Sequence, residues 1–394
     1  MKDIKKQLLR TGHAPILIFV GIFVVVGTLS LLVTHAATVL HVFSVSPESG
    51  TLSGNVALVP DATAIGGKAL KFGMTKATVP SGGSTTTGDG QNMIVGVNIN
   101  GIGSNAGPDM AGAVKYVRAD MKSWGLSAST FTNSGIKIDD LLQGPYSTSG
   151  ISGLGSPTTW ANTALGWYQS AGCNPTLCPM VEVLNEPGGT WFWGGSSLTV
   201  ANATAYDNIL IATYNAFTKA YGSSRPLVLA SFDGGYSTGS DWGQYMWQAN
   251  SAIGNYINGI TVHPYDTSSS GLGSQTNVTN SYTQAKSLAG RSIPVYITEI
   301  GWQTTPTASE TTNGDTPQPG TVLLSTSQQC SNVYNFIGWA RGLKYVNAVI
   351  LFDYRDDNAN TAGDGTYGIE YADGTHKPSY AGIAAAALDK ANPC

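Results

Sequence analysis

Short apolar runs alternate with amphipathic stretches from about residue 92 to the end of the chain. The runs are rich in β-branched residues and bounded by Gly, Asn or Asp, which is typical of buried strands, and several of the stretches between them have helical spacing. We predict strands at Ile94–Ile99, Val114–Asp120, Gly135–Asp139, Met180–Asn185, Leu227–Phe232, Gly259–His263, Val295–Glu299 and Ala348–Phe352. We predict helices at Thr159–Ser170, Ala201–Tyr221, Ser281–Leu288, Ser327–Leu343 and Ser379–Lys390.

Eight strands, alternating with helices over about 300 residues, are the sequence pattern of a (β/α)8 barrel. The predicted fold class is therefore α/β, a TIM barrel. The segment 141–158 is rich in Gly and Ser and predicts a long loop after the third strand.

The part of the chain that precedes the barrel has three different compositions. Residues 1–37 combine four basic residues among the first ten with an uncharged apolar stretch, Ala14–Val33, long enough to span a bilayer. This predicts either a cleaved signal peptide or a retained membrane anchor, with the rest of the chain outside the plasma membrane. Residues 38–73 predict a short β-rich segment, and residues 74–91, dominated by Gly, Ser and Thr, predict a flexible linker to the barrel domain at 92–394.

Charge and cysteine content narrow the possible partners and the compartment. A net charge of -4 with only 11% charged residues gives no basic surface for nucleic acid. Four cysteines suit an oxidising compartment. Cys173 and Cys178 enclose a short loop and are predicted to pair, and Cys330 could pair with Cys394; free thiols are the alternative.

No motif predicts a cofactor or a metal centre. One acidic loop offers the oxygen ligands that calcium prefers, but its spacing is not that of an EF-hand, so we interpret it as a polar turn. Its acidic and amide residues are Asp356, Asp357, Asn358, Asn360 and Asp364.

Two of the predicted strands lead directly to a glutamate. Glu186 follows the fourth strand and Glu299 ends the seventh. The C-terminal ends of barrel strands surround one cleft, and strands four and seven face each other across it, so the two carboxylates are expected to approach to about 5 Å. Such a pair suits acid/base chemistry on a glycosidic bond. The alternative is that both are solvated charges at the starts of loops.

Three short motifs carry a resemblance to a known group of enzymes. They are Asn185-Glu-Pro after the fourth strand, His263-Pro-Tyr after the sixth and Thr298-Glu-Ile-Gly-Trp after the seventh. In this order they resemble the retaining glycoside hydrolases of clan A, and are similar in particular to family 5 cellulases or family 39 enzymes. The resemblance covers roughly residues 92–391. Residues 38–73 in turn resemble part of a carbohydrate-binding jelly roll; a stalk without binding activity is the alternative.

The resemblance implies a role for each matching residue. Glu186 is implied to be the general acid/base, a role for which the carboxyl pKa is expected to move upward in a partly buried site. Glu299 is implied to be the nucleophile, which must be ionised to attack the anomeric carbon. Asn185 is implied to bind the 2-hydroxyl of the sugar.

Further residues are implied to support the two glutamates. Arg118 resembles the second-strand arginine that holds the nucleophile ionised; an ion pair with Asp120 or Glu182 is the alternative. Glu182, four residues before the acid/base, is interpreted as a buried structural partner. His263 and Tyr265 match residues that orient the glutamates, with core packing as the alternative for the histidine.

Aromatic residues near these motifs are candidates for stacking on sugar rings. Trp191, Trp193 and Trp302 suit this role, and core packing is the alternative for each. The eighth strand departs from the clan pattern, because many members have a tryptophan there. Phe352 or Tyr354 would replace it, which leaves the exact family and the substrate open.

The sequence thus predicts a retaining glycoside hydrolase that cleaves β-glycosidic bonds in a polysaccharide, an endo-acting β-glycanase similar to cellulases. We expect a monomer without cofactor or metal, bound to a polysaccharide or oligosaccharide substrate and to no nucleic acid. It would be secreted or anchored to the outer face of the plasma membrane, touching the membrane only through its N-terminal segment. The alternatives are a non-catalytic carbohydrate-binding or adhesion protein, and a transglycosylase that remodels wall or capsule polymers.

Overall fold

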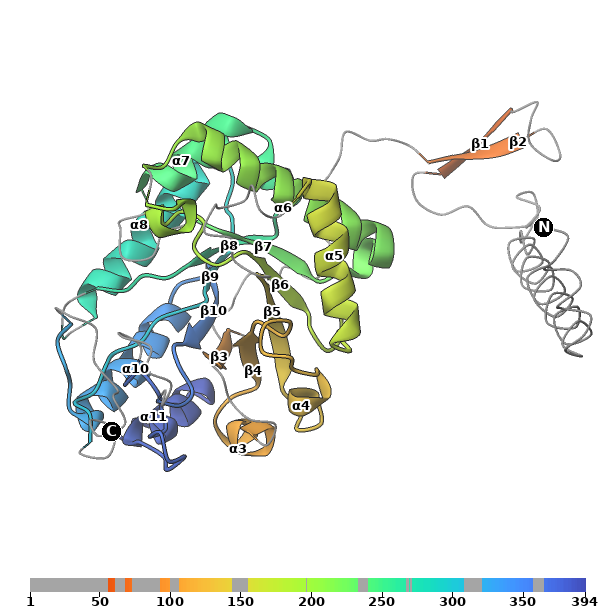
Figure 1. Cartoon of the computed structure of the whole chain (residues 1–394). Helices are drawn as coiled ribbons and strands as arrows, with labels where there is room; N and C mark the ends of the chain where they lie inside the picture. Colours follow the sequence, from red (N-terminus) through yellow and green to blue (C-terminus); the bar gives the residue numbers. More distant parts are fainter. Residues whose placement is uncertain are drawn as a thin grey trace, which may run out of the picture. The chain divides into compact units, whose positions relative to one another are not determined.

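The structure is a computed structural model (Figure 1). Its internal contacts divide the chain into two units, residues 1–78 and residues 79–394, and each is described separately. Element labels are those of Figure 1. The predicted N-terminal segment, 1–37, and the predicted linker, 74–91, lie outside the described residues. Within the described part of the chain, no helix has both the length and the apolar character needed to cross a membrane. The described residues are 56–60, 68–72, 93–99, 106–143, 155–195, 197–232, 240–266, 269, 271–307, 321–356 and 365–394.

The described part of the first unit is one pair of antiparallel strands. β1 (Val56–Pro60) pairs with β2 (Lys68–Phe72). Both strands fall within the segment 38–73 for which the sequence predicted β-structure.

The second unit is a closed barrel of eight parallel strands, which confirms the predicted TIM barrel. The strands follow one another around the barrel in sequence order, and the last one pairs with the first to close it. The strands are β3 (Ile94–Asn98), β4 (Tyr116–Ala119), β5 (Lys137–Leu142), β6 (Met180–Val183), β7 (Leu227–Ser231), β8 (Gly259–Val262), β9 (Val295–Ile297) and β10 (Val346–Leu351).

Helices surround these strands (Figure 1). Apolar side chains from the outer faces of the strands and the inner faces of the helices form one large core between the two layers. The α-helices of the described residues are α3 (Ala106–Ala113), α4 (Ser129–Thr132), α5 (Pro157–Ser170), α6 (Val200–Tyr221), α7 (Ser240–Ala249), α8 (Leu272–Ala289), α10 (Thr326–Arg341) and α11 (Pro378–Ala387). The described residues also form the short 3-10 helices η3 (Thr190–Trp193), η4 (Gly222–Ser224) and η5 (Ile253–Tyr256).

The inside of the barrel has its own packing. A small buried cluster is formed by Met180, Leu229, Tyr296 and Ala348. Polar and charged residues occupy the strands as well, and parallel pairing places them side by side; Arg118, for example, is the register partner of Asn98 on one neighbouring strand. The register therefore gathers polar groups inside an otherwise apolar barrel.

Seven of the eight predicted strands extend past the observed C-terminal end, whereas β5 continues beyond the predicted end at Asp139 to Leu142. The error matters at three strands, because β6 ends at Val183, β8 at Val262 and β9 at Ile297, so the candidate residues that follow lie at the starts of loops. After β6 the backbone turns sharply, because Leu184 and Glu186 both have positive φ, 62° and 48°. A strand cannot continue through such residues.

Helices α3, α4 and α7 were not predicted. Glycine obscures two of them, because it is a poor helix former. In α3, a Cβ at Gly107 would lie 2.3 Å from the carbonyl oxygen of Thr130 in α4, so only glycine allows the two helices to come this close. In α7, a Cβ at Gly243 would lie 2.3 Å from the ring of Phe232. Tight packing explains these glycines, and local propensity does not.

Both predicted disulfides are present. Cys173 pairs with Cys178 across a short loop, and Cys330 pairs with Cys394 across a sequence separation of 64 residues. The second bond joins α10 to the C-terminus.

Candidate active site

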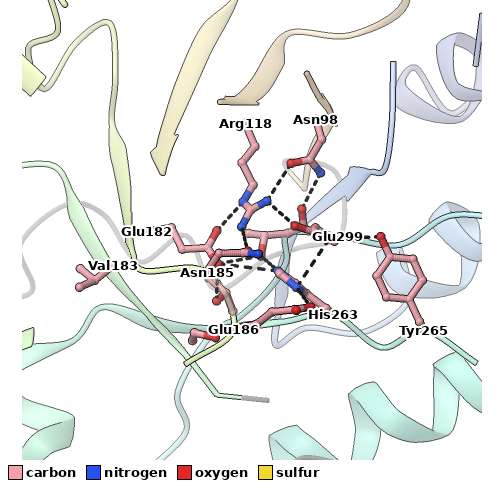
Figure 2. A network of polar contacts seen from close by, with 12 residues as sticks. Asn98, Arg118, Glu182, Val183, Asn185, Glu186, His263, Tyr265 and Glu299 are labelled. Carbon is pink, nitrogen blue, oxygen red and sulfur yellow. Dashed lines mark hydrogen bonds and ion pairs between the residues drawn. The ribbon is translucent and has the colours of Figure 1, made fainter. Parts of the chain in front are cut away.

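Arg118 lies at the centre of a polar network at the C-terminal ends of the barrel strands (Figure 2). Its Nε donates to Oε2 of Glu182 at 2.6 Å, and its Nη1 donates to Oε1 of Glu299 at 2.6 Å. One guanidinium therefore binds both the predicted nucleophile, Glu299, and Glu182, which the sequence analysis considered as an alternative partner of Arg118. Burial alone would lower the pKa of Arg118, but the charges of Glu182 and Glu299 outweigh it and raise the pKa, so this residue stays cationic.

Two amide side chains complete the coordination of Arg118. Nη1 also donates to Oδ1 of Asn98 at 2.9 Å, and Nη2 donates to Oδ1 of Asn185 at 2.8 Å. Asn98 is in turn held by its Nδ2, which donates to the carbonyl oxygen of Thr298 at 2.8 Å. Sequence reasoning missed Asn98. The available signal was an amide on an otherwise apolar strand, one strand away from an inward-facing arginine.

Glu299 is buried between two donors. Arg118 binds its Oε1, and the hydroxyl of Tyr265 donates to its Oε2 at 3.2 Å. Only 9% of Glu299 is exposed. Two donors on opposite oxygens fix the orientation of this carboxylate, which attack on carbon requires.

Glu186 has a different environment. Nδ1 of His263 lies 2.7 Å from its Oε1, and Trp191 contributes a further side-chain hydrogen bond. Burial would raise the pKa of Glu186, but the hydrogen bond and charge of His263 and the charge of Arg118 outweigh it and lower the pKa. The upward shift predicted from the sequence is therefore wrong for the free protein, because His263 was not recognised as a cation beside this carboxyl.

His263 is fully buried and holds its charge by contact with carboxylates. Burial lowers its pKa, but the charge of Glu299 and the hydrogen bond and charge of Glu186 outweigh burial and raise the pKa to about 9. The other ring nitrogen faces Thr298, whose Oγ1 is 3.1 Å from Nε2. His263 therefore lies between the two candidate catalytic carboxylates.

The two carboxylates are close to each other. One oxygen of Glu186, one oxygen of Glu299 and one ring nitrogen of His263 all lie within 4.8 Å of one another. This separation suits direct attack by one carboxylate and proton transfer by the other, whereas an inverting pair is about 6.5–9.5 Å apart to admit a water. The same three groups could ligate a cation, but Arg118 already supplies positive charge to Glu299 at 2.6 Å.

The loop after β6 brings Trp191 to Glu186. A Cβ at Gly189 would lie 2.5 Å from Nε1 of Trp191, so glycine makes room for this indole. The neighbouring Trp193 anchors the loop by donating from Nε1 to the carbonyl oxygen of Pro187 at 2.6 Å. Trp191 remains 50% exposed, as a platform for a sugar ring must be, whereas Trp193 is partly buried against the core.

The remaining aromatic candidates separate into two groups. The ring of Phe352 packs edge-on against Tyr367, which packs against Tyr265, so Phe352 is connected to the site through aromatic contacts. Trp302 is only 6% exposed and packs edge-on against Phe336, which favours core packing.

Tyr354 belongs to a different cluster. It is completely buried, and its hydroxyl lies within hydrogen-bond distance of two carboxylates, Glu370 at 2.9 Å and Asp109. Nε2 of His376 also contacts both acids, at 3.1 Å from Asp109 and 3.2 Å from Glu370. Its interpretation as a floor residue of the sugar site is therefore wrong, because its hydroxyl is bound by this cluster.

The acidic loop considered for calcium is described in part. Asp356 is buried and bound by Lys377, whose Nζ is 2.6 Å from its Oδ2. The other four residues of the loop lie outside the described residues. The lysine makes Asp356 a structural ion-pair partner.

Comparisons with known proteins bear on the fold. No protein-family model matches the sequence, and neither does any curated protein. A family 39 glycoside hydrolase from Bacteroides cellulosilyticus WH2 is similar in structure, with a TM-score of 0.50 and 16% identity over 76% of this chain and 64% of that one. This chain thus spans less than two thirds of that protein. A fungal β-1,4-galactanase also has a TM-score of 0.50, with 14% identity over 69% of this chain and 88% of that one.

At such low identity these likenesses show the fold. It is the TIM barrel that the resemblance to clan A glycoside hydrolases predicted, found in two solved structures of glycan-cleaving enzymes. Any activity of this chain must be argued from its own site.

Proposed function

We propose that the protein is a retaining glycoside hydrolase that cleaves β-glycosidic bonds in a polysaccharide by double displacement. The observation that carries this proposal is the pair of carboxylates at the ends of β6 and β9, with oxygens within 4.8 Å of each other and with unlike partners. Glu299 is bound by a permanent cation and a hydroxyl, whereas Glu186 is bound by a group that can exchange a proton. Unlike environments are what assign unlike roles to two carboxylates.

In the first step, an oxygen of Glu299 attacks the anomeric carbon as the glycosidic carbon–oxygen bond breaks. The proton held between Glu186 and His263 moves to the leaving oxygen. In the second step, Glu186 takes a proton from water, the hydroxyl oxygen attacks the anomeric carbon, and the bond to Glu299 breaks. Two inversions give net retention, and the proton returns to its starting position.

Other residues of the site support sugar binding. Because Oδ1 of Asn185 accepts from Arg118, its amide nitrogen is the group that would donate to the 2-hydroxyl. The half-exposed Trp191 beside Glu186 would stack on a sugar next to the cleaved bond. These features support an extended glycan as substrate, cleaved within the chain.

We also propose that the protein works outside the plasma membrane, either secreted or anchored. Two disulfides support an oxidising compartment. The basic residues and the apolar stretch of segment 1–37 support export.

The activity is tested with a panel of β-glucan, mannan, xylan, galactan and bacterial exopolysaccharides, measuring new reducing ends and, by NMR, the anomer released first. We expect the β-anomer first and loss of turnover in Glu299→Gln. We expect Glu186→Ala to keep some activity on a substrate with an activated leaving group and to be accelerated by azide, which needs no general base. Asp389→Asn makes the same acid-to-amide change at a side chain that is 83% exposed and should behave like the wild type.

Three outcomes would contradict the proposal. Glycan binding without turnover in the wild type would favour the non-catalytic alternative. Products longer than the substrate would favour transglycosylation. Initial release of the α-anomer would show inversion and overturn the two-step mechanism.

A further inference from the structure

Glu182, on β6, contacts residues that bind each of the two candidate catalytic carboxylates. Its side chain is 0% exposed. Oε2 accepts from Nε of Arg118 at 2.6 Å, and Oε1 accepts from the hydroxyls of Thr261 at 2.8 Å and Thr298 at 3.3 Å. Arg118 in turn donates a hydrogen bond to Glu299, and Thr298 forms a hydrogen bond with His263. One buried carboxylate is thereby connected to the candidate nucleophile and to the partner of the acid/base.

The directions of these hydrogen bonds determine where one proton must be. Thr298 has a single hydroxyl hydrogen, and it donates this hydrogen to Oε1 of Glu182. Oγ1 of Thr298 can then only accept from Nε2 of His263, 3.1 Å away. Nε2 therefore carries a hydrogen in both the neutral and the charged ring.

The other ring nitrogen is then the one that titrates. Nδ1 of His263 either accepts from a protonated Glu186 or donates to an ionised one, across the same 2.7 Å contact. In both cases one proton lies between these two groups. It is the proton that the leaving oxygen requires.

We propose that Glu182 and Thr298 are positioning residues that fix a hydrogen on Nε2 of His263 and so dedicate Nδ1 to the proton shared with Glu186. The catalytic consequence rests on the proposed function, whereas the state of the ring can be measured without it. Glu182 positions Arg118 with its other oxygen, so one side chain orients the supports of both catalytic carboxylates.

Charged groups around the imidazole are consistent with this assignment. Oε1 of Glu186 and Oε2 of Glu299 lie 2.7 and 3.7 Å from Nδ1, and Oε1 of Glu182 lies 3.8 Å from Nε2. Arg118 opposes them as the cation that lowers the proton affinity of His263. The three carboxylates around the ring favour a proton on each nitrogen. Their effect outweighs that of the single cation, which disfavours it.

The test replaces the hydroxyl of Thr298 and keeps the shape of the side chain. Thr298→Val retains the backbone carbonyl that accepts from Asn98, and Thr298→Ser restores the hydroxyl. Thr261→Val is the matched control, because it removes the other hydroxyl on the same oxygen of Glu182 and leaves the partner of Nε2 in place. Glu182→Gln would remove the charge of the carboxylate as well as one of its acceptor oxygens, and buried Arg118 would lose one of its two carboxylate partners. The threonine variants avoid this second effect and are therefore used for the test.

The direct measurement is histidine-selective ¹⁵N NMR of the full-length protein between pH 5 and 10, with His263 assigned by comparison with His263→Gln among the five histidines. In the wild type we expect Nε2 to remain protonated throughout and Nδ1 alone to titrate. In Thr298→Val we expect a mixture of the two neutral tautomers and a midpoint about one pH unit lower, because the lost hydrogen bond stabilises the charged ring more than the neutral ring. Thr298→Ser should restore the wild-type spectrum, and Thr261→Val should keep the Nε2–H state.

The kinetic measurement is the pH profile of kcat/KM with aryl glycosides of good and poor leaving groups. In Thr298→Val we expect the alkaline limb to move down by about one pH unit. The loss should be larger for the poor leaving group, which needs the proton. If the role of Thr298 were purely structural, the substitution would instead lower kcat/KM equally for both substrates at every pH.

The two proposals fail separately. If the wild type cleaves no glycan but shows Nε2–H that is lost in Thr298→Val, the proposed function is wrong and the ring assignment holds. If the wild type is active, and Thr298→Val keeps both its tautomer and its pH profile, the assignment to Thr298 and Glu182 is overturned. A wild-type ring that carries its neutral-state proton on Nδ1 would overturn it as well.

Discussion

Replacing Arg118 by lysine keeps the charge and removes the shape of the guanidinium. The three nitrogens of Arg118 donate to four acceptors, two carboxylates and two amide oxygens, at 2.6 to 2.9 Å. A lysine has one nitrogen with three donors, so it cannot reach acceptors that lie on different sides of a planar fork. At least one carboxylate and one amide oxygen would lose their donor.

The size of the effect follows from these contacts. Each of these hydrogen bonds has the charged guanidinium as its donor, and such a bond contributes about 1.5–3 kcal/mol. Losing two of them lowers the free energy of unfolding by about 3–6 kcal/mol, close to the range of about 3–5 kcal/mol for breaking a buried ion pair. If Glu299 shifts by about 1 Å, activity on any substrate found for the wild type should fall about 100-fold.

Urea unfolding at pH 7 measures the first quantity, with the m-value checked to ensure that the denatured state is unchanged. Arg341→Lys is the control, because its ion pair with Asp389 is exposed and should be worth less than about 1 kcal/mol. If Arg118→Lys lost no more stability than Arg341→Lys, the guanidinium geometry would not be what holds the site together.

Two further predictions concern stability. Asp207 is 2% exposed, its carboxyl oxygens have no hydrogen-bond partner among the described residues, and burial raises its pKa to about 8. Between about pH 4 and pH 8 the unfolded chain ionises here while the native state keeps the proton, so native stability falls as pH rises. Asp207→Asn should therefore raise the free energy of unfolding by about 2–4 kcal/mol at pH 7 and by little at pH 4; an equal effect at both pH values in urea titrations would contradict this. Cys394→Ser opens a 64-residue link to Cys330 and should cost about 4 kcal/mol, against about 2 kcal/mol for Cys173→Ser, whose link spans 5 residues. Equal losses in the same unfolding assay would show that chain entropy does not set the difference.

The barrel strands could be predicted because most of them are short runs of β-branched and other apolar residues that the barrel buries, separated by stretches with helical spacing. The ends of the strands could not. At Leu184 and Glu186 a positive φ stops the strand, although neither residue type signals a turn. Helices α3 and α7 contain glycines whose purpose is contact with another element, which local propensity does not reveal.

The candidate site was predictable where a motif names a residue. Glu186, Glu299 and their partners Arg118 and His263 are brought together by the fold as expected. Asn98 was not predicted, because its contact with Arg118 depends on strand register and on no motif. The sequence also does not show which charged group lies beside each carboxylate. The contact of His263 with Glu186 was therefore missed as a source of positive charge, and the direction of the pKa shift at Glu186 was predicted wrongly.

The balance of charge in the network determines which ligands it favours. Three carboxylates, Glu182, Glu186 and Glu299, face one guanidinium and, with the shared proton on His263, one imidazolium, which leaves one net negative charge on these five groups. Passing that proton from His263 to Glu186 leaves the total unchanged, because both groups belong to the network. The network therefore keeps its negative potential up to the moment of proton donation. In a buried site of low dielectric, such a potential favours a cationic, oxocarbenium-like species over the neutral sugar from which it forms.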